Sequence, residues 1–390
     1  MNRASLGSKA LMGVCALLTL AAFGAWVFQQ VNGLSVTGMS NVTSWGLYIV
    51  CFMFFVGLSA GGLIVASSAT VFHIERFKSV ALPAVILSTV CICLAGAFVL
   101  IDLGGIQRVW RMFTGLNVRS PLAWDMVVIV CYLAINVIYL YFMCAPRAKR
   151  DNVKYVSRIA LPVAILVHTV TAWIFGLQIS HEGWHSAIMG PLFVVSAMDS
   201  GLALLILVLL GLERRGAFHT EKALISSLAG LMVTCLAIDA YMIGCELLTT
   251  GYPGGEGFGR ILSVMLSGQT APFFWFEVIA GILIPFCILV FKRNRENMAL
   301  VALSSVLIVC GVFCKRVWLL FTSFVHPNLS GVPGVSLGTT AAQGGDAWAV
   351  FATVGTYAPT WVELAIVVGA VAFGVLAFTL LARWLLPKAR

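Results

Sequence analysis

Ten long apolar stretches, separated by short polar segments, make up most of this 390-residue chain. Each is close to the roughly 20 residues that an α-helix needs to cross the hydrocarbon core of a bilayer. The first stretch lacks the small-residue cleavage site of a secretory signal, so we interpret it as a span. The pattern predicts ten membrane-spanning helices, at approximately 10–29, 45–72, 80–101, 124–144, 159–179, 189–212, 223–248, 270–291, 298–321 and 361–386.

The composition supports the same fold class. Hydrophobic residues make up 61% of the chain and charged residues 10%, whereas soluble proteins carry about 25% charged residues. We therefore predict an all-α integral membrane protein that lies in the lipid bilayer through almost its whole length. A soluble domain with a single anchor is excluded.

Lysine and arginine are distributed unevenly between the two sides that these spans define. Eighteen of the 24 basic residues lie in the termini and in alternate loops, and the other set of loops holds only Arg108, Arg111, Arg119 and Arg260. Because cytoplasmic loops carry the excess of basic residues, we predict that both termini are cytoplasmic. The net charge of +9 reflects this asymmetry and does not indicate a surface for nucleic acid.

Two pairs of motifs indicate an internal repeat. SPLAWD at 120–125 opens the fourth span, and APFFWFE at 271–277 opens the eighth. Asp102 ends the third span, and Asp239 lies in the seventh. Spans 2–5 and 6–9 would then form two four-helix bundles in the same orientation, because four spans return the chain to the same side. Chance similarity between membrane segments is the alternative.

The repeat divides the chain into four parts. They are a first span with its outer loop at 1–44, a first four-helix bundle at 45–180, a second at 181–321, and a long outer loop with the last span at 322–390. The long outer loop is rich in glycine and proline. Its length fits either a docking surface for a partner outside the membrane or a disordered tether.

Ionisable side chains inside a bilayer are costly, so each is a functional candidate. In the first bundle these are Asp102 and Asp125, near the outer ends of spans 3 and 4, and His168 near the middle of span 5. The second bundle holds a larger set, which we interpret as a polar path: Asp199, Asp239, Glu246, Glu277, Lys315 and Arg316. The alternative is structural pairing, in which the two cations neutralise carboxylates on neighbouring helices.

The stretch HEGWH at 181–185 matches the pattern in which two histidines hold zinc and a glutamate activates water. A zinc protease needs these three side chains on one helical face, together with a third ligand. Gly183 inside the motif disfavours a helix by about 1 kcal/mol, and no second acidic motif supplies the ligand. We predict an outer turn that joins two spans, without a zinc site.

The histidine and cysteine positions do not fit a redox group in this chain. A haem b in the membrane needs two axial histidines at matching depth, and only His168 lies deep in a span. All 11 cysteines lie within apolar runs, and no CxxC motif occurs. We predict no haem and no iron–sulfur cluster, with the cysteines packing as small apolar residues.

Several stretches together resemble the NrfD/PsrC family of quinone-interacting membrane subunits. The resemblance covers about spans 2–10, and the motifs occur in the family's order. They are TSWGLYIVCFMFFVGLSAGG (43–62), IDLGGIQRVWRM (101–112), NVRSPLAWDMVVIVCYL (117–133), VHTVTAWIFG (167–176), GWHSAIMGPLFVVSAMDSG (183–201) and YAPTWVE (357–363).

The resemblance implies a fold of two four-helix bundles with flanking helices, without haem. It implies a menaquinone or ubiquinone site close to the outer face. It also implies partners on the outer side, namely a ferredoxin-like iron–sulfur subunit and a larger catalytic subunit of the molybdopterin or multihaem type. The membrane implied is the cytoplasmic membrane of a bacterium or an archaeon.

Five residues match the family's motifs. Asp102 matches an acidic or histidine position at the end of span 3, and Asp125 matches the acidic position of the Trp-Asp pair in span 4. His168, Trp184 and His185 match positions in span 5 and in the turn that follows it.

The sequence also departs from the family's pattern. Gly105 stands where the family often has arginine, which leaves Arg108 as a candidate replacement. Span 2 has Ser-Ala-Gly-Gly at 59–62 where some members carry a histidine, so we do not predict proton pumping.

We therefore hypothesise a membrane subunit that is not catalytic on its own and reacts with quinone in a respiratory oxidoreductase complex. Asp102 and Asp125 would exchange hydrogen bonds and protons with the quinone headgroup. Trp124 would pack against the ring, and His168 would form part of a polar path. A secondary transporter is the alternative, because parallel repeats and mid-membrane carboxylates also fit that class. A membrane scaffold for the same complex is the third possibility.

Overall fold

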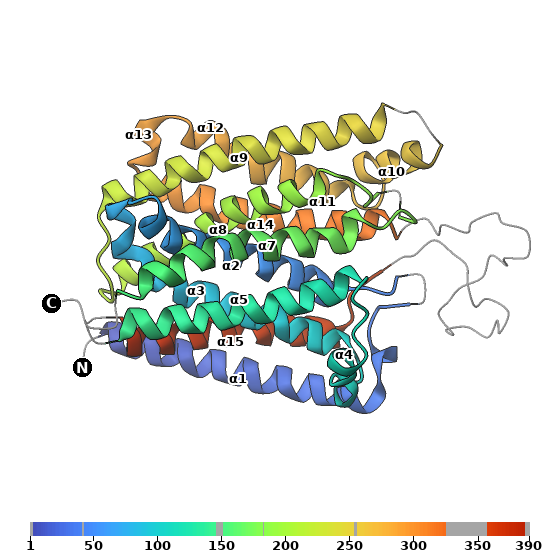
Figure 1. The fold of residues 1–390 in the computed structure, drawn as a ribbon, viewed down its shortest axis with the longest axis horizontal. Coiled ribbons are helices and arrows are strands. Elements are labelled where there is room, and N and C mark those ends of the chain that lie inside the picture. Colours follow the sequence, from blue (N-terminus) through green and yellow to red (C-terminus); the bar gives the residue numbers. More distant parts are fainter. Residues whose placement is uncertain are drawn as a thin grey trace, which may run out of the picture.

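The computed structural model describes residues 3–40, 43–145, 151–181, 183–252, 256–324 and 357–386. This described part is helical and contains no strand (Figure 1). Ten of its helices are long and apolar enough to cross a membrane, which confirms the predicted all-α membrane protein. The outer loop predicted as a docking surface or tether lies largely outside the described residues.

The ten spans are α1 (Arg3–Asn32), α2 (Leu47–Val71), α3 (Ala81–Asp102), α5 (Pro121–Cys144), α7 (Val153–Gly176), α8 (Met189–Arg214), α9 (Lys222–Gly251), a composite helix of α11 (Ala271–Trp275), the π-helix η4 (Phe276–Leu283) and α12 (Ile284–Leu289), α14 (Met298–Thr322) and α15 (Trp361–Leu385). The shorter helices are η1 (Leu34–Val36), η2 (Glu75–Val80), η3 (Ile106–Arg108), α4 (Arg111–Thr114), α10 (Glu256–Leu266) and α13 (Lys292–Arg295).

The predicted spans differ most from the observed helices at α1 and α7. Helix α7 begins six residues before its predicted start, because backbone hydrogen bonding continues through Lys154 and Arg158. Long basic side chains of this kind can extend from a helix end toward the polar surface of a membrane. At its other end, α7 stops at Gly176 and the chain turns, although the apolar run continues to 179.

The molecule has two ends along the helix axes. Helix α1 begins and α15 ends at the same end, which we call the terminal end (Figure 1). At the opposite end, which we call the far end, α1 ends at Asn32 and α2 begins at Leu47. Helices α3, α7, α9 and α14 end at the far end, whereas α5, α8, the composite helix and α15 begin there.

The central eight spans form two closed rings with the same order. In the first bundle α2 contacts α3, α3 contacts α5, α5 contacts α7, and α7 contacts α2. In the second bundle α8 contacts α9, α9 contacts the composite helix, the composite helix contacts α14, and α14 contacts α8. Helices α1 and α15 pack against each other, and α15 also packs on α3 of the first bundle.

The two rings meet through their first helices. A Cβ placed on Gly61 of α2 would lie 2.5 Å from the Cα of Gly201 on α8, and one placed on Gly201 would lie 2.6 Å from the Cα of Gly61. The reciprocal distances mean that the two backbones touch at these two glycines. Only glycine at both positions permits this approach, since a side chain on either helix would overlap the other backbone.

The two motifs that indicated a repeat have matching roles. Trp124 and Trp275 each lie three residues after a proline in the first turn, and each indole N–H donates to a carbonyl of the preceding segment, at 2.6 Å and 2.9 Å. Asp125 directly follows Trp124, whereas Glu277 lies two residues after Trp275, so the second bundle has one extra residue between the tryptophan and the acid. The extra residue coincides with the π-helix, a wider turn that adds a residue to an α-helical repeat.

Candidate functional site

Polar side chains from α1, α2 and α3 meet in the interior at the far end. The Tyr48 hydroxyl donates to Gln29 Oε1 at 2.6 Å, and Gln29 Nε2 donates to the carbonyl of Ile101 at 3.1 Å. Tyr48 and Gln29 are fully buried. Their hydrogen bonds therefore join three helices where two of them end and one begins.

Glu363, at the start of α15, connects the segments around this region through hydrogen bonds. Its Oε2 accepts hydrogen bonds from the backbone of Gly38 at 2.7 Å and of Thr360 at 2.9 Å, and its Oε1 accepts one from the Tyr357 hydroxyl. Tyr357 in turn accepts the N–H of Leu47. Burial raises the pKa of Tyr357, and Glu363 raises it further, so the hydroxyl stays protonated and donates.

Asp102 lies at the end of α3, beside these groups. It is half-buried, and its buried Oδ1 has no hydrogen-bond partner within the described residues. Glu363 and Tyr48 are both within its electrostatic reach. We call Gln29, Tyr48, Asp102, Tyr357 and Glu363 the far-end cluster. Among the described residues of this cluster, the buried acceptor without a hydrogen-bond partner is Asp102 Oδ1, which is placed to accept a further donor.

Asp125 lies in a different environment on α5. It is buried, and its Oδ1 accepts a hydrogen bond from the Thr171 hydroxyl of α7 at 2.6 Å. Asp125 and Asp102 share no hydrogen-bond partner among the described residues. That both carboxylates contact one quinone headgroup stays a prediction.

The other residues predicted in the first bundle are dispersed. Trp124 and Arg108 are exposed at the far end. Trp184 is buried, donates its indole N–H to the carbonyl of Leu319 at 2.8 Å, and stacks on Trp45. His185 is exposed. Trp184 thus packs the seam between the bundles, while Trp124, Arg108 and His185 remain accessible.

His168 is buried in α7, one helical turn before Thr171 and therefore closer to the terminal end. Its Nδ1 lies 2.6 Å from the carbonyl oxygen of Ala164 in its own helix, and its Nε2 lies 3.0 Å from the carbonyl oxygen of Val56 on α2. Both ring nitrogens therefore face acceptors.

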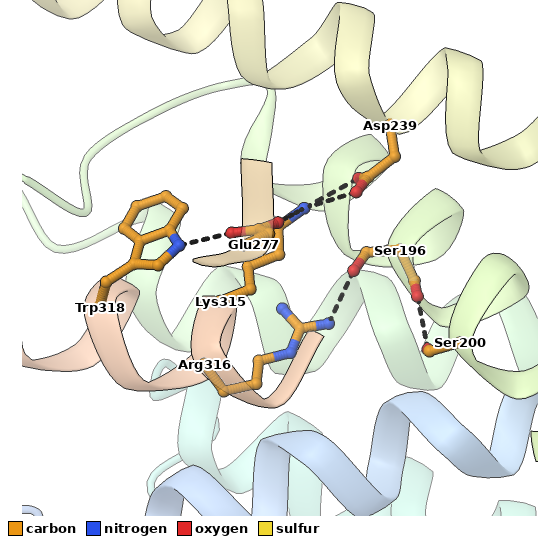
Figure 2. Close-up of polar contacts among 7 residues, drawn as sticks. All are labelled: Ser196, Ser200, Asp239, Glu277, Lys315, Arg316 and Trp318. Atoms are coloured by element: carbon orange, nitrogen blue, oxygen red, sulfur yellow. Dashed lines mark hydrogen bonds and ion pairs between the residues drawn. The ribbon is translucent and has the colours of Figure 1, made fainter. Parts of the chain in front are cut away.

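A cluster of charges fills the interior of the second bundle (Figure 2). Lys315 Nζ on α14 lies 2.9 Å from both carboxyl oxygens of Asp239 on α9 and 3.4 Å from Glu277 Oε1 on η4. The other oxygen of Glu277 accepts the indole N–H of Trp318. All four side chains are buried. Lys315 therefore pairs with carboxylates of two neighbouring helices.

Arg316 extends from the same helix toward α8. Its guanidinium lies over the ring of Phe193 at 4.1 Å, and its Nη2 approaches the Ser196 hydroxyl at 3.5 Å. Its Nε and Nη1 are buried without partners among the described residues. Asp199, one turn after Ser196, is fully buried, and neither of its oxygens has an ion-pair or side-chain hydrogen-bond partner in the described part of the chain. Unpaired donors and acceptors are therefore present in one region.

Glu246 is the member of the predicted path that the fold does not bring to Lys315. Its Oε2 accepts a hydrogen bond from Ser186 in the turn before α8, at 2.6 Å, and it is only partly buried. Sequence reasoning missed Gln29, Tyr48, Thr171 and Trp318 as partners. Each is a neutral polar side chain inside a span, a signal that is weaker than charge but readable in the sequence.

The HEGWH stretch lies in the turns between α7 and α8, as predicted. Glu182 lies outside the described residues. The His181 ring packs on Trp184 at 4.3 Å between ring centroids, and burial lowers the pKa of His181. Within the described ranges, no group of three or more His, Cys, Asp or Glu side chains is placed to hold a metal ion.

Comparison with known proteins gives one family. The family's sequence model, described as polysulphide reductase, NrfD, matches residues 35–328. A protein of Halobacterium salinarum, provisionally named as a membrane subunit of dimethyl sulfoxide reductase, is 37% identical over 94% of this chain and 88% of its own length. The Hdr-like menaquinol oxidoreductase integral membrane subunit of Archaeoglobus fulgidus is 29% identical, over 84% and 82%. An Escherichia coli protein provisionally named the b-type cytochrome subunit of Ni/Fe-hydrogenase 2 is 28% identical, over 97% and 90%.

Proposed function

This chain belongs to the polysulphide reductase NrfD family, and from that premise we propose that it is the quinone-reactive membrane subunit of a respiratory oxidoreductase complex. Relatives named as membrane subunits of reductase and menaquinol oxidoreductase complexes support the class of complex. The single observation that carries the quinone assignment is the far-end cluster, where a carboxyl group has an open acceptor beside a neutral tyrosine.

The far end is the proposed outer face. The loops and helix ends of the terminal end hold most of the basic residues, so by the positive-inside rule that end is cytoplasmic. Asp102 and the far-end cluster then lie near the outer surface of a bacterial or archaeal cytoplasmic membrane. A quinol that diffuses in the bilayer reaches this depth without leaving the lipid.

Asp102 is the proposed proton partner of the headgroup. Oxidation of a quinol to a quinone releases two electrons and two protons, and a carboxylate within hydrogen-bond reach of the hydroxyl lowers the barrier to proton loss. The open Oδ1 of Asp102 is placed to accept such a hydrogen bond. Asp125, with its single partner Thr171, is the candidate for the next proton position.

The electrons pass to or from a partner on the outer side, for which we propose a ferredoxin-like iron–sulfur subunit followed by a larger catalytic subunit of the molybdopterin or multihaem type. The donor set of the described chain does not fit a haem held by two histidines. Among the described residues, His168 is the histidine inside a span. A carbonyl oxygen lies within hydrogen-bond distance of each of its ring nitrogens, so neither nitrogen faces an open position for a metal. Menaquinone is the favoured quinone, since a relative is named for it, and ubiquinone is the alternative.

The test is the quinol-coupled activity of the intact complex carrying Asp102→Asn. We expect a loss of at least tenfold in quinol-coupled turnover, with dye-coupled catalysis by the partner unchanged. Asp151→Asn, an exposed aspartate at the terminal end, is the matched control and should leave both activities intact. Unchanged quinol turnover in Asp102→Asn would refute the role of Asp102.

The second candidate function is a secondary transporter, which the buried cluster of Lys315, Asp239 and Glu277 favours. Copurification separates the two functions. The oxidoreductase subunit should be isolated with an iron–sulfur protein and a large catalytic subunit, whereas a transporter should be isolated without them. Quinone-analogue binding to the purified complex distinguishes a quinone-reactive subunit from a scaffold.

A further inference from the structure

Buried polar groups cross the interface between the two bundles through one turn of α2. His168 approaches this turn from the first bundle, with Nε2 at 3.0 Å from the Val56 carbonyl oxygen. Arg316 approaches it from the second bundle, since a Cβ placed on Gly57 would lie 3.6 Å from Arg316 Nη2. Adjacent residues of α2 thus contact a histidine of one bundle and an arginine of the other, and the two side chains are within electrostatic reach.

The charges of the second bundle do not balance. The cluster holds the carboxylates Asp199, Asp239 and Glu277 against the cations Lys315 and Arg316, all buried and within mutual electrostatic reach. Three negative and two positive groups leave one excess negative charge in the interior of a membrane protein. An uncompensated buried charge is strongly unfavourable, so the cluster binds one proton.

Asp199 is one of two side chains that can bind this proton. Asp239 and Glu277 each face Lys315 at 2.9 Å and 3.4 Å, which favours their ionised forms. Asp199 has no ion pair and no side-chain hydrogen bond to any described residue. It therefore gains least from being ionised, and the proton that balances the cluster is held most easily there.

His168 is the second side chain that can bind the proton. A neutral imidazole has one N–H and one nitrogen with a lone pair. With carbonyl oxygens 2.6 Å and 3.0 Å from the two nitrogens, the neutral ring directs a lone pair at a carbonyl. The imidazolium has two N–H donors and satisfies both acceptors. Against this, burial of the ring disfavours a charged imidazole, and the positive charge of Arg316 opposes a second cation nearby.

We propose that Asp199 and His168 share a single proton across the bundle interface, so that this interface is a proton-binding site. When the O–H bond of Asp199 breaks, an N–H bond forms on His168. The imidazolium is then satisfied by two carbonyls, and the new carboxylate lies within electrostatic reach of Arg316. The total charge is the same in both forms. The charged groups around the pair are Arg316 and Lys315 on α14, Asp239 on α9 and Glu277 on η4.

Arg316, which is within electrostatic reach of both residues, supplies the proposed route. Arg316 Nε and Nη1, with the oxygens of Asp199, form a set of buried donors and acceptors without partners in the described structure. Groups of this kind are normally bridged by ordered water. The Ser196 hydroxyl lies in the same region, at 3.5 Å from Arg316 Nη2 (Figure 2). The proposal does not depend on quinone chemistry.

Infrared spectroscopy of the full chain in lipid tests the proposal through the carbonyl stretch of protonated carboxylic acids. We expect Asp199→Asn to remove one component of this band. His168→Gln cannot accept the proton and should increase the same component, up to twofold if the proton is shared equally in the native protein. Asp151→Asn and His219→Gln, both at exposed residues, are the matched controls and should leave the band unchanged.

A second measurement uses the native protein and is independent of how the variants fold. Nitrogen NMR of histidine-labelled protein reports the imidazolium form of His168, and its population should rise as the Asp199 band falls when the temperature changes. No Asp199 component in the band, no increase in His168→Gln, or a neutral His168 under all conditions would each overturn the proposal. These readouts need no quinol turnover, so they can fail while the proposed function holds.

Discussion

In the first bundle the buried acid nearest the start of its third helix, Asp125, accepts a hydrogen bond from a threonine. Its counterpart in the second bundle, Glu277, lies between a lysine and a tryptophan. The two acids follow tryptophans with the same anchoring role, in rings of helices with the same order. One scaffold therefore surrounds an acid that is bonded to a hydroxyl group and an acid that is paired with a cation.

The difference shows how side chains can diverge inside a repeated membrane fold. Every helix satisfies its own backbone hydrogen bonds, so the ring of helices does not depend on the polar groups inside it. Replacing a threonine partner by a lysine then requires only that further carboxylates accompany the cation. In the second bundle Asp239 and Glu277 fill that role, and the π-helix η4 carries Glu277.

The largest expected effect is on the charged site. Lys315→Met should lower the free energy of unfolding by about 3–5 kcal/mol, because it leaves two buried carboxylates without their cation. Denaturant titration in lipid micelles measures the change. Lys222→Met, at an exposed lysine of the same bundle, is the control and should have little effect.

A neutral version of the cluster sharpens this test. In Lys315→Met combined with Asp239→Asn and Glu277→Gln, the carboxylates are neutral as well. We expect most of the lost stability to return, since removing a whole buried charge network costs less than removing one partner. A triple variant as unstable as Lys315→Met alone would mean that packing of the lysine stem, and not its charge, stabilises the bundle.

The next effect concerns the contact between the bundles. Gly201→Val should lower the free energy of unfolding by about 2–3 kcal/mol, because the new side chain overlaps the backbone of α2 at Gly61. Gly211→Val in the same helix is the matched control, since a Cβ there has no neighbour within 4 Å. Equal stability of the two variants would contradict the backbone contact between the first helices.

A smaller effect is expected at the site of Asp125 in the first bundle. Thr171→Val should lower the free energy of unfolding by about 1–2 kcal/mol, because Asp125 loses its hydrogen-bond donor in a buried position. Thr169→Val is the control, since Thr169 makes a similar hydrogen bond to its own helix but none to an acid. If both variants lose the same amount, the bond to Asp125 contributes nothing measurable.

The smallest effects test the repeat itself. Trp124→Phe and Trp275→Phe each remove one exposed hydrogen bond to a carbonyl of the segment before the helix and should each lower the free energy of unfolding by about 0.5–1 kcal/mol. Urea or detergent titration of the two variants side by side gives the comparison. Clearly unequal losses would show that the two tryptophans anchor their helices differently.

The sequence determined the ten spans, the family and the list of buried ionisable residues. Hydropathy suffices for the spans because an apolar run of about 20 residues satisfies its own backbone hydrogen bonds in lipid by forming a helix. The repeat was indicated by two sequence motifs, which contain Trp124 and Trp275 and can be identified without a structure. Span ends were less certain, as at α7, because a helix continues past the residues that lie in lipid.

Only the tertiary structure decided which polar residues meet. Asp102 and Asp125 both lie near the far end, and the fold places Asp102 beside Glu363 and Tyr48 but bonds Asp125 to Thr171. Glu246 is an acid in a span of the second bundle and was predicted in its polar path, but it accepts a hydrogen bond from Ser186 and does not contact Lys315 among the described residues. The direction of a side chain depends on the rotation and depth of its helix, which are set by contacts such as that of Gly61 with Gly201. Those contacts join distant parts of the chain, so hydropathy along the sequence does not contain them.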